Sequence, residues 1–256
     1  MELAFRKYGE GPPLLILHGL FGQMDNWNSL AKQFASLGFT AITIDQRNHG
    51  LSPHSYEWTY ELMAHDLMEF IEHHNLQSPI ILGHSMGGKT LMFFEKLFPK
   101  IAQKLIICDI AARAYEPKHN EVVAALNAVD FNHVKTRKDA ELVLNSFIKD
   151  FGTKQFLLKN IYWKDTDTNL MDWRFNLKAI TDNYNNVSVA VPEFISNSPT
   201  LIIRGSLSDY INEEDIQNFN LRFNNITIET ILDAGHWVHA EKPLDFFECV
   251  KRFIVN

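Results

Sequence analysis

Residues 80–88, Ile-Ile-Leu-Gly-His-Ser-Met-Gly-Gly, decide the fold class, because a short apolar run passes through Gly-x-Ser-x-Gly into a helix-length segment. An apolar run of this length is typical of a strand that is buried on both faces. The glycines on either side of Ser85 allow a sharp strand-to-helix turn that lifts the serine hydroxyl out of the sheet. We therefore predict that Ser85 is a nucleophile at the tip of this turn, with the Met86 amide at the start of the helix.

Similar apolar runs alternate with helix-length segments on both sides of this turn. We expect strands at residues 14–17, 40–44, 79–82, 105–108, 201–203 and 226–232, and helices at residues 29–37, 59–74, 89–98 and 243–254. Continuous apolar strands separated by helices favour βαβ units and a parallel sheet. The predicted fold class is α/β, with a mostly parallel central sheet flanked by helices.

The segment 111–198 interrupts this alternation. It contains no strong strand pattern, whereas residues 122–129, 139–147 and 175–184 carry apolar side chains three and four positions apart, which is typical of amphipathic helices. We expect this segment to be a helical cap, inserted into a core made of residues 1–110 and 199–256. Substrate specificity is expected to reside in the cap.

A serine hydroxyl is a weak nucleophile at neutral pH and needs a base, which is usually a histidine. Of the 11 histidines, His236 fits best, because it lies between the last predicted strand and the closing helix. The oxyanion that forms in the reaction needs two amide donors. Met86 is one candidate, and the loop His18-Gly19-Leu20-Phe21-Gly22 provides the other, from Leu20 or alternatively from Phe21. His18 itself is expected to hold this loop by local hydrogen bonds.

The acid that would orient His236 is ambiguous in the sequence. A carboxylate is usual three residues after Gly205, but Ser208 occupies that position. Asp209 lies one position later, and Asp109 ends the neighbouring predicted strand. Because the carboxyl ends of both strands face the same crevice, either residue could reach the imidazole. We favour Asp109, since it ends a buried strand and should be held rigidly, whereas Asp209 lies in a predicted turn.

The composition excludes several other functions. The chain has 256 residues, of which 46% are hydrophobic and 21% charged, which is typical of a globular protein. Its formal net charge is −7 and it has no basic run, so nucleic acid is not an expected partner. No segment has the roughly 18 consecutive apolar residues that a membrane helix needs. No Cys and His cluster has metal-ligand spacing, so a zinc hydrolase is not expected.

The two cysteines indicate the compartment. Cys108 lies in an apolar run and Cys249 in a helical pattern, which is typical of free buried thiols in a reducing environment. Because the first residues also lack the apolar stretch of a signal peptide, we expect a cytoplasmic location. The sequence indicates no particular oligomeric state.

Four segments carry recognisable motifs: residues 18–22, residues 45–54 (Asp-Gln-Arg-Asn-His-Gly-Leu-Ser-Pro-His), residues 83–89 and residues 235–243. The first and third of these motifs are widespread, whereas residues 47–54 and 235–240 are more selective. Together the four segments resemble the α/β-hydrolase fold, and more closely the YbfF-type esterases and their abhydrolase-domain relatives. The resemblance implies hydrolysis of carboxylic esters by Ser85 and His236 without a metal or organic cofactor, and it allows acyl-CoA thioesters. It also implies an acid from the end of the strand before the cap, which is Asp109 here.

The sequence thus predicts a serine hydrolase that acts on a small-molecule ester or thioester through an acyl-enzyme. The same Ser-His-Asp set could serve a C–C bond hydrolase or a cofactor-free perhydrolase. A protein of this fold could also be a non-catalytic binder of a small ligand, but such a binder has no need to keep Ser85 and His236 together.

Overall fold

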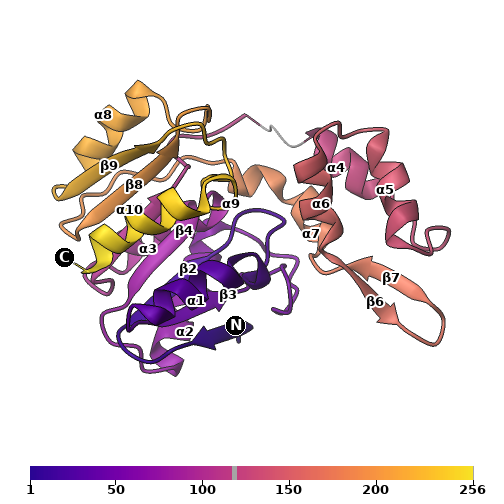
Figure 1. Cartoon of the computed structure of the whole chain (residues 1–256), viewed down its shortest axis with the longest axis horizontal. Coiled ribbons are helices and arrows are strands. Elements are labelled where there is room, and N and C mark those ends of the chain that lie inside the picture. Colours follow the sequence, from indigo (N-terminus) through magenta and orange to yellow (C-terminus); the bar gives the residue numbers. More distant parts are fainter. Residues whose placement is uncertain (117–119, 256) are drawn as a thin grey trace.

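A computed structural model describes residues 1–116 and 120–255 of the chain. Its centre is a seven-stranded sheet with the strand order β1-β3-β2-β4-β5-β8-β9 (Figure 1). The strands are β1 (Phe5–Tyr8), β2 (Pro13–Leu17), β3 (Thr40–Ile44), β4 (Ile80–His84), β5 (Lys104–Cys108), β8 (Thr200–Gly205) and β9 (Ile226–Ile231).

The sheet is parallel except at one edge. β1 pairs antiparallel with β3, and all the other pairs of neighbouring strands are parallel. This confirms the predicted α/β class with a mostly parallel sheet. The sequence pattern does not predict β1, because three of its four residues are exposed and no buried apolar run marks it.

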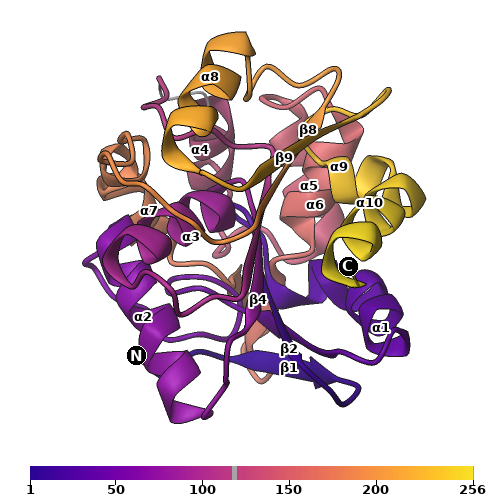
Figure 2. The ribbon, with the colours of Figure 1, turned by 90° about the vertical axis from the view of Figure 1, so that its left-hand side faces the viewer.

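Helices cover both faces of the sheet. Leu15 and Leu17 of β2 belong to one apolar cluster with residues of α2 (Tyr60–His73), α3 (Met86–Leu97) and α8 (Glu213–Arg222). Leu14 and Ile16 belong to a second cluster with residues of α1 (Asn28–Ser36) and α10 (Pro243–Val255). Figure 2 shows α2 and α3 on one side of the sheet and α1 and α10 on the other. Because both faces are covered, the inner strands are continuous apolar runs in the sequence.

Residues 111–198 leave the sheet after β5 and return at β8, and most of them form the lobe on the right of Figure 1. The elements of residues 111–198 are α4 (Asn120–Asn127), α5 (Arg137–Asn145), α6 (Phe151–Leu158), β6 (Ile161–Asp165), β7 (Leu170–Trp173), α7 (Leu177–Asp182) and the 3-10 helix η2 (Tyr184–Val187). The helices α4, α5 and α7 overlap the three predicted ones. The antiparallel hairpin of β6 and β7 was not predicted, because charged residues interrupt its apolar ones. Residues 117–119 of the predicted cap lie outside the described residues.

The two chain segments that connect this lobe to the rest of the chain run side by side. The Tyr115 N–H donates to the Ser188 carbonyl at 2.8 Å, and the Val191 N–H donates to the Ala112 carbonyl at 2.7 Å. Lys89 of α3 is fully buried beneath them, and its Nζ donates to the carbonyl oxygens of residues 113 and 189, each at 2.7 Å. The two backbone hydrogen bonds therefore join the two connections, and the buried Lys89 amine holds both against the core.

Cys108 and Cys249 are both buried and unpaired, which confirms the prediction of free thiols. Burial raises the pKa of the Cys249 thiol to about 11, so it stays protonated at neutral pH. Among the described residues, no helix is both long and apolar enough to cross a membrane.

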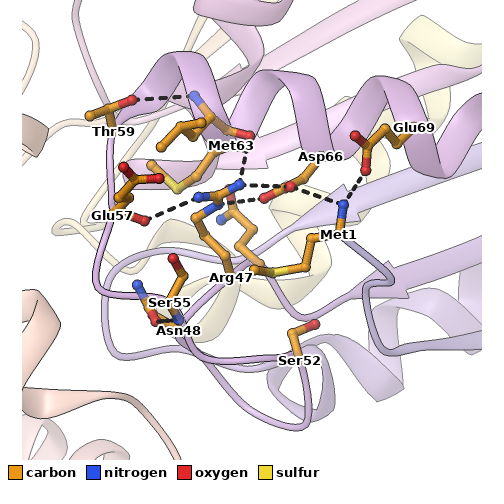
Figure 3. A network of polar contacts seen from close by, with 12 residues as sticks. Met1, Arg47, Asn48, Ser52, Ser55, Glu57, Thr59, Met63, Asp66 and Glu69 are labelled. Atoms are coloured by element: carbon orange, nitrogen blue, oxygen red, sulfur yellow. Dashed lines mark hydrogen bonds and ion pairs between the residues drawn. The ribbon is translucent and has the colours of Figure 1, made fainter.

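Arg47 fixes the loop after β3 to α2 (Figure 3). Its guanidinium makes a bidentate ion pair with Asp66, with Nε at 2.5 Å from Oδ2 and Nη2 at 2.8 Å from Oδ1. Both side chains are buried, and the other N–H groups of Arg47 donate to the carbonyl oxygens of Glu57 and Leu62. The N-terminal ammonium of Met1 lies 3.4 Å from Asp66 on the opposite side. The loop is thus anchored by charges that are largely withdrawn from water.

Replacing Arg47 by Leu is expected to lower the free energy of unfolding by about 3–5 kcal/mol, because the Asp66 carboxylate stays buried after losing its bidentate partner. Urea titration of both proteins measures this difference. The control is Arg6→Leu, since the Arg6–Asp25 pair is 48% and 42% exposed and should contribute less than about 1 kcal/mol. Equal losses for the two variants would contradict the expected role of the buried pair.

Candidate active site

Ser85 lies at the turn between β4 and α3 with backbone angles φ 51° and ψ −119°. A positive φ is unfavourable for a residue that has a side chain. Two glycines make room for the turn: a Cβ atom at Gly83 would lie 2.3 Å from the Gly87 carbonyl oxygen, and one at Gly87 would lie 2.5 Å from the Leu17 carbonyl oxygen. The residues on both sides of Ser85 are buried, whereas Ser85 is only half-buried. The serine is therefore the part of the turn that solvent reaches.

His236 lies in the loop between β9 and the short helix α9 (Val238–Glu241), and its imidazole joins Ser85 to Asp109. Its Nε2 atom lies 2.9 Å from Ser85 Oγ, and its Nδ1 atom lies 2.8 Å from Asp109 Oδ2. Because a carboxylate only accepts hydrogen bonds, Nδ1 carries the proton of the neutral ring and Nε2 accepts the proton of the serine hydroxyl. The His236 side chain is 22% exposed, so a substrate can approach it.

Asp109 follows β5, and its carboxylate is fully buried. Oδ1 accepts from the Gly205 N–H at 3.0 Å, and Oδ2 accepts from the Ser208 hydroxyl as well as from His236. These three donors offset the cost of burying the charge. The Asp109 N–H donates to the Ile203 carbonyl at 2.8 Å, so both its main chain and its side chain are held by β8 and the loop after it.

The structure separates the two candidate acids. Asp109 contacts His236, whereas Asp209 is exposed and its carbonyl oxygen accepts a long hydrogen bond of 3.5 Å from Arg113 Nη2. Ser208 stands where an acid is usual, and its hydroxyl donates to Asp109. Ser208 therefore supplies no carboxylate of its own, but donates a hydrogen bond to the Asp109 carboxylate that follows the neighbouring strand β5.

The three candidate oxyanion donors differ in their partners. The Phe21 N–H donates to His49 Nε2 at 3.2 Å and is occupied. The hydrogen bonds found within residues 1–116 and 120–255 include none from the Leu20 or Met86 amide. Both residues line a cavity beside Ser85. An amide that is free and next to the nucleophile is suited to bind an oxyanion, so this geometry favours Leu20 and Met86.

Three buried histidines, His18, His49 and His84, and the half-buried His239 surround these groups. Loss of contact with water lowers the pKa of each imidazole, to about 3 for His49 and His239. They are neutral at pH 7, because this shift disfavours the charged form. His18 contacts the Gly19 carbonyl at 2.8 Å and accepts from the Gln46 N–H at 3.0 Å. This confirms that His18 holds its loop by local hydrogen bonds.

Two residues next to His236, His84 and Tyr210, are not predicted from the sequence. The His84 Nε2–H donates to the His236 carbonyl at 2.8 Å, which joins the loop that holds His236 to the residue before Ser85. The Tyr210 ring stacks on the imidazole, with 3.8 Å between ring centroids and 17° between planes. His84 occupies the variable position of Gly-x-Ser-x-Gly and Tyr210 follows a turn, so neither position carried a sequence signal.

Two cavities meet at Ser85 and Leu20. The small cavity has a volume of about 50 Å³ and is lined by Met86, Lys89 and Tyr210 among others. The large cavity has a volume of about 500 Å³ and is lined by Phe156, His236 and Trp237 among others. In the part of the chain that the structure describes, no group of three or more His, Cys, Asp or Glu residues is arranged to hold a metal ion.

The chain is similar to known proteins over most of its length. Residues 12–243 match a family model described as the alpha/beta hydrolase fold. Esterase YbfF of Escherichia coli is 34% identical over 94% of this chain and 92% of its own length. The sn-1-specific diacylglycerol lipase ABHD11 of Mus musculus is 35% identical over 95% of this chain and 81% of its own length. A solved structure described as a marine microorganism esterase has a TM-score of 0.95 at 42% identity, and the match covers 99% of both chains.

Proposed function

The chain belongs to the α/β-hydrolase family and is a carboxylic ester hydrolase, and we propose that Ser85, His236 and Asp109 carry out its reaction. The resemblance to YbfF-type esterases is confirmed by the 34% identity to esterase YbfF. One observation supports the proposed residues above all others: hydrogen bonds run from the half-buried Ser85 hydroxyl through His236 to the buried Asp109 carboxylate. This is the arrangement in which a histidine accepts a serine proton while a carboxylate stabilises the resulting imidazolium.

In the proposed cycle, Ser85 Oγ attacks the carbonyl carbon of the ester while its proton passes to His236 Nε2. The oxyanion accepts hydrogen bonds from the Leu20 and Met86 amides. The bond to the leaving group then breaks, and the leaving oxygen takes the proton from Nε2, which leaves an acyl-Ser85 ester. Water attacks this ester, its proton passes to Nε2 and then to Ser85 Oγ, and the carboxylic acid is released.

We extend the proposal to acyl thioesters, including acyl-CoA. The cycle requires only that the leaving atom meets His236 Nε2, and a thiolate is a better leaving group than an alkoxide. We also propose that residues 111–198 act as the cap that sets specificity, since Tyr115 lines the small cavity and Phe156 lines the large one. A cytoplasmic location stays a prediction from the two free cysteines.

The test uses p-nitrophenyl acetate and acetyl-CoA with the whole chain. We expect turnover of the ester at a kcat of about 1 to 10³ s⁻¹, and intact-mass spectra of rapidly acid-quenched samples should show one added acetyl group. Turnover of the ester but not of acetyl-CoA would remove the thioester extension. Binding of the ester without release of p-nitrophenol would contradict the proposal and favour a non-catalytic binder.

A further inference from the structure

The two cavities that meet at Ser85 differ in which catalytic groups they contain. Leu20 and Ser85 line both, but His236 lines only the large cavity. Met86 and Tyr210 line only the small one. Because Tyr210 is stacked on the imidazole at 3.8 Å, its ring lies between His236 and the small cavity. The large cavity therefore gives a substrate access to His236, and the small cavity gives it access to Met86.

The chemistry assigns the two halves of the substrate to these cavities. The leaving atom must receive its proton from His236 Nε2, so the leaving group has to lie on the side of the imidazole. The acyl group has to lie on the other side of Ser85, near the amides of Leu20 and Met86. The leaving group therefore belongs in the large cavity, and the acyl chain belongs in the small cavity.

The small cavity limits the length of the acyl chain. One water-sized group occupies about 10–15 Å³ of such space, so a volume of about 50 Å³ holds roughly three to five heavy atoms. The large cavity is about ten times larger, at about 500 Å³. Phe156 of α6 and Trp237, with ring centroids 5.5 Å apart, give it an aromatic wall.

The walls of the small cavity are held in place by partly buried hydrogen bonds. Lys89 donates to two carbonyl oxygens of the connections to the cap. The Tyr60 hydroxyl donates to the Val187 carbonyl at 2.9 Å, and the Tyr115 hydroxyl donates to the Tyr210 carbonyl at 2.6 Å. Opening this cavity for a longer chain would have to break these hydrogen bonds, which costs free energy.

From these observations we propose that the chain selects esters and thioesters of short acyl groups, of about two to four carbons, that carry a large leaving group. The inference rests on the proposed function, since it uses the positions of the leaving atom and the oxyanion around Ser85. It adds the substrate class and states which cavity recognises each half.

The first experiment measures kcat/KM of the unaltered protein for p-nitrophenyl esters of two, four, eight and twelve carbons, and for acetates of methanol, p-nitrophenol and 2-naphthol. We expect kcat/KM to fall about 10- to 100-fold between four and eight carbons, the effect of forcing extra methylenes into a packed space. We expect 2-naphthyl acetate to be hydrolysed within about threefold of p-nitrophenyl acetate, because the large cavity has room for both leaving groups.

The second experiment compares variants of the two cavities. Val187→Ala enlarges the small cavity and should raise the relative rate for the eight-carbon ester at least about fivefold. The matched control, Phe156→Ala, enlarges the large cavity, and it should alter the dependence on the leaving group while leaving the chain-length profile unchanged. If Phe156→Ala instead raised the relative rate for the eight-carbon ester, and Val187→Ala changed only the dependence on the leaving group, the proposal would be overturned. The acyl chain would then occupy the large cavity and the leaving group the small one.

The outcomes for the unaltered protein separate this inference from the proposed function without relying on any variant. If eight- and twelve-carbon esters are hydrolysed as fast as the acetate, the short-acyl inference is overturned and the esterase function stands. If no ester of any length is hydrolysed, both fail together.

Discussion

Ser85→Ala is expected to lower kcat for p-nitrophenyl acetate by about 10⁴- to 10⁶-fold, because no other group can form the acyl-enzyme. Alanine keeps a Cβ atom and the same backbone requirements, so the turn with φ 51° should persist. The Leu20 and Met86 amides, which we propose as the oxyanion donors, also stay in place. What remains is the modest acceleration that binding and the oxyanion donors provide without a nucleophile. Stopped-flow release of p-nitrophenol measures the loss.

The control for this variant is Ser36→Ala on the exposed end of α1, where the hydroxyl donates to the Gln33 carbonyl. It should keep full activity. Thermal unfolding of Ser85→Ala within a few degrees of the unaltered protein shows that the fold is retained. A Ser85→Ala protein with this stability and more than about a tenth of the original kcat would remove Ser85 from the mechanism.

Asp109→Asn is the second substitution for which we expect a very large effect, a fall in kcat of about 10⁴-fold. An amide can turn its NH₂ group toward His236 Nδ1, which then has to accept a hydrogen bond. The ring proton moves to Nε2, and Nε2 can no longer take the proton of Ser85. The lost interaction operates in the transition state, so kcat should fall far more than KM rises.

Asp209→Asn provides the matched control, because it makes the same chemical change one position from Ser208. Asp209 is exposed and Asp109 is fully buried. We expect Asp209→Asn to keep kcat within about twofold, as is usual for an exposed substitution away from the reacting atoms. Steady-state kinetics of the two variants side by side decides the ranking. A larger loss for Asp209→Asn would transfer the role of the acid to Asp209.

The fold was largely predictable from the sequence, because strands buried on both faces are visible as short apolar runs. The runs at 40–44 and 105–108 match β3 and β5 closely. The edge strand β1 and the hairpin of β6 and β7 were not predictable in this way. β1 is largely exposed and the hairpin has charged residues among its apolar ones, so tertiary pairing rather than an apolar pattern defines these strands.

The candidate site is visible in the sequence where local backbone chemistry marks it. Gly83 and Gly87 are needed at the turn because a Cβ atom at either would overlap the backbone, and this need is visible in the sequence. The residues around His236 were not visible in the same way. Tyr210 and His84 reach the loop that holds His236 only because the carboxyl ends of the parallel strands β4, β8 and β9 lie on the same side of the sheet.

The segment 45–54 shows why a selective motif need not be catalytic. Arg47 binds Asp66 of α2, the Asn48 carbonyl accepts from the Asn176 N–H of the cap region at 2.8 Å, and His49 accepts from the Phe21 N–H. The motif thus links α2, the inserted segment 111–198 and the loop 18–22 by hydrogen bonds.

The account depends on a Ser85 hydroxyl that is made nucleophilic by His236, and labelling with a fluorophosphonate tests this directly. Peptide mapping after stoichiometric labelling should find one adduct, on the peptide that contains Ser85, and His236→Ala should slow its formation by at least about 10³-fold. An adduct on a different serine, or labelling of Ser85 at an unchanged rate in His236→Ala, would contradict the account.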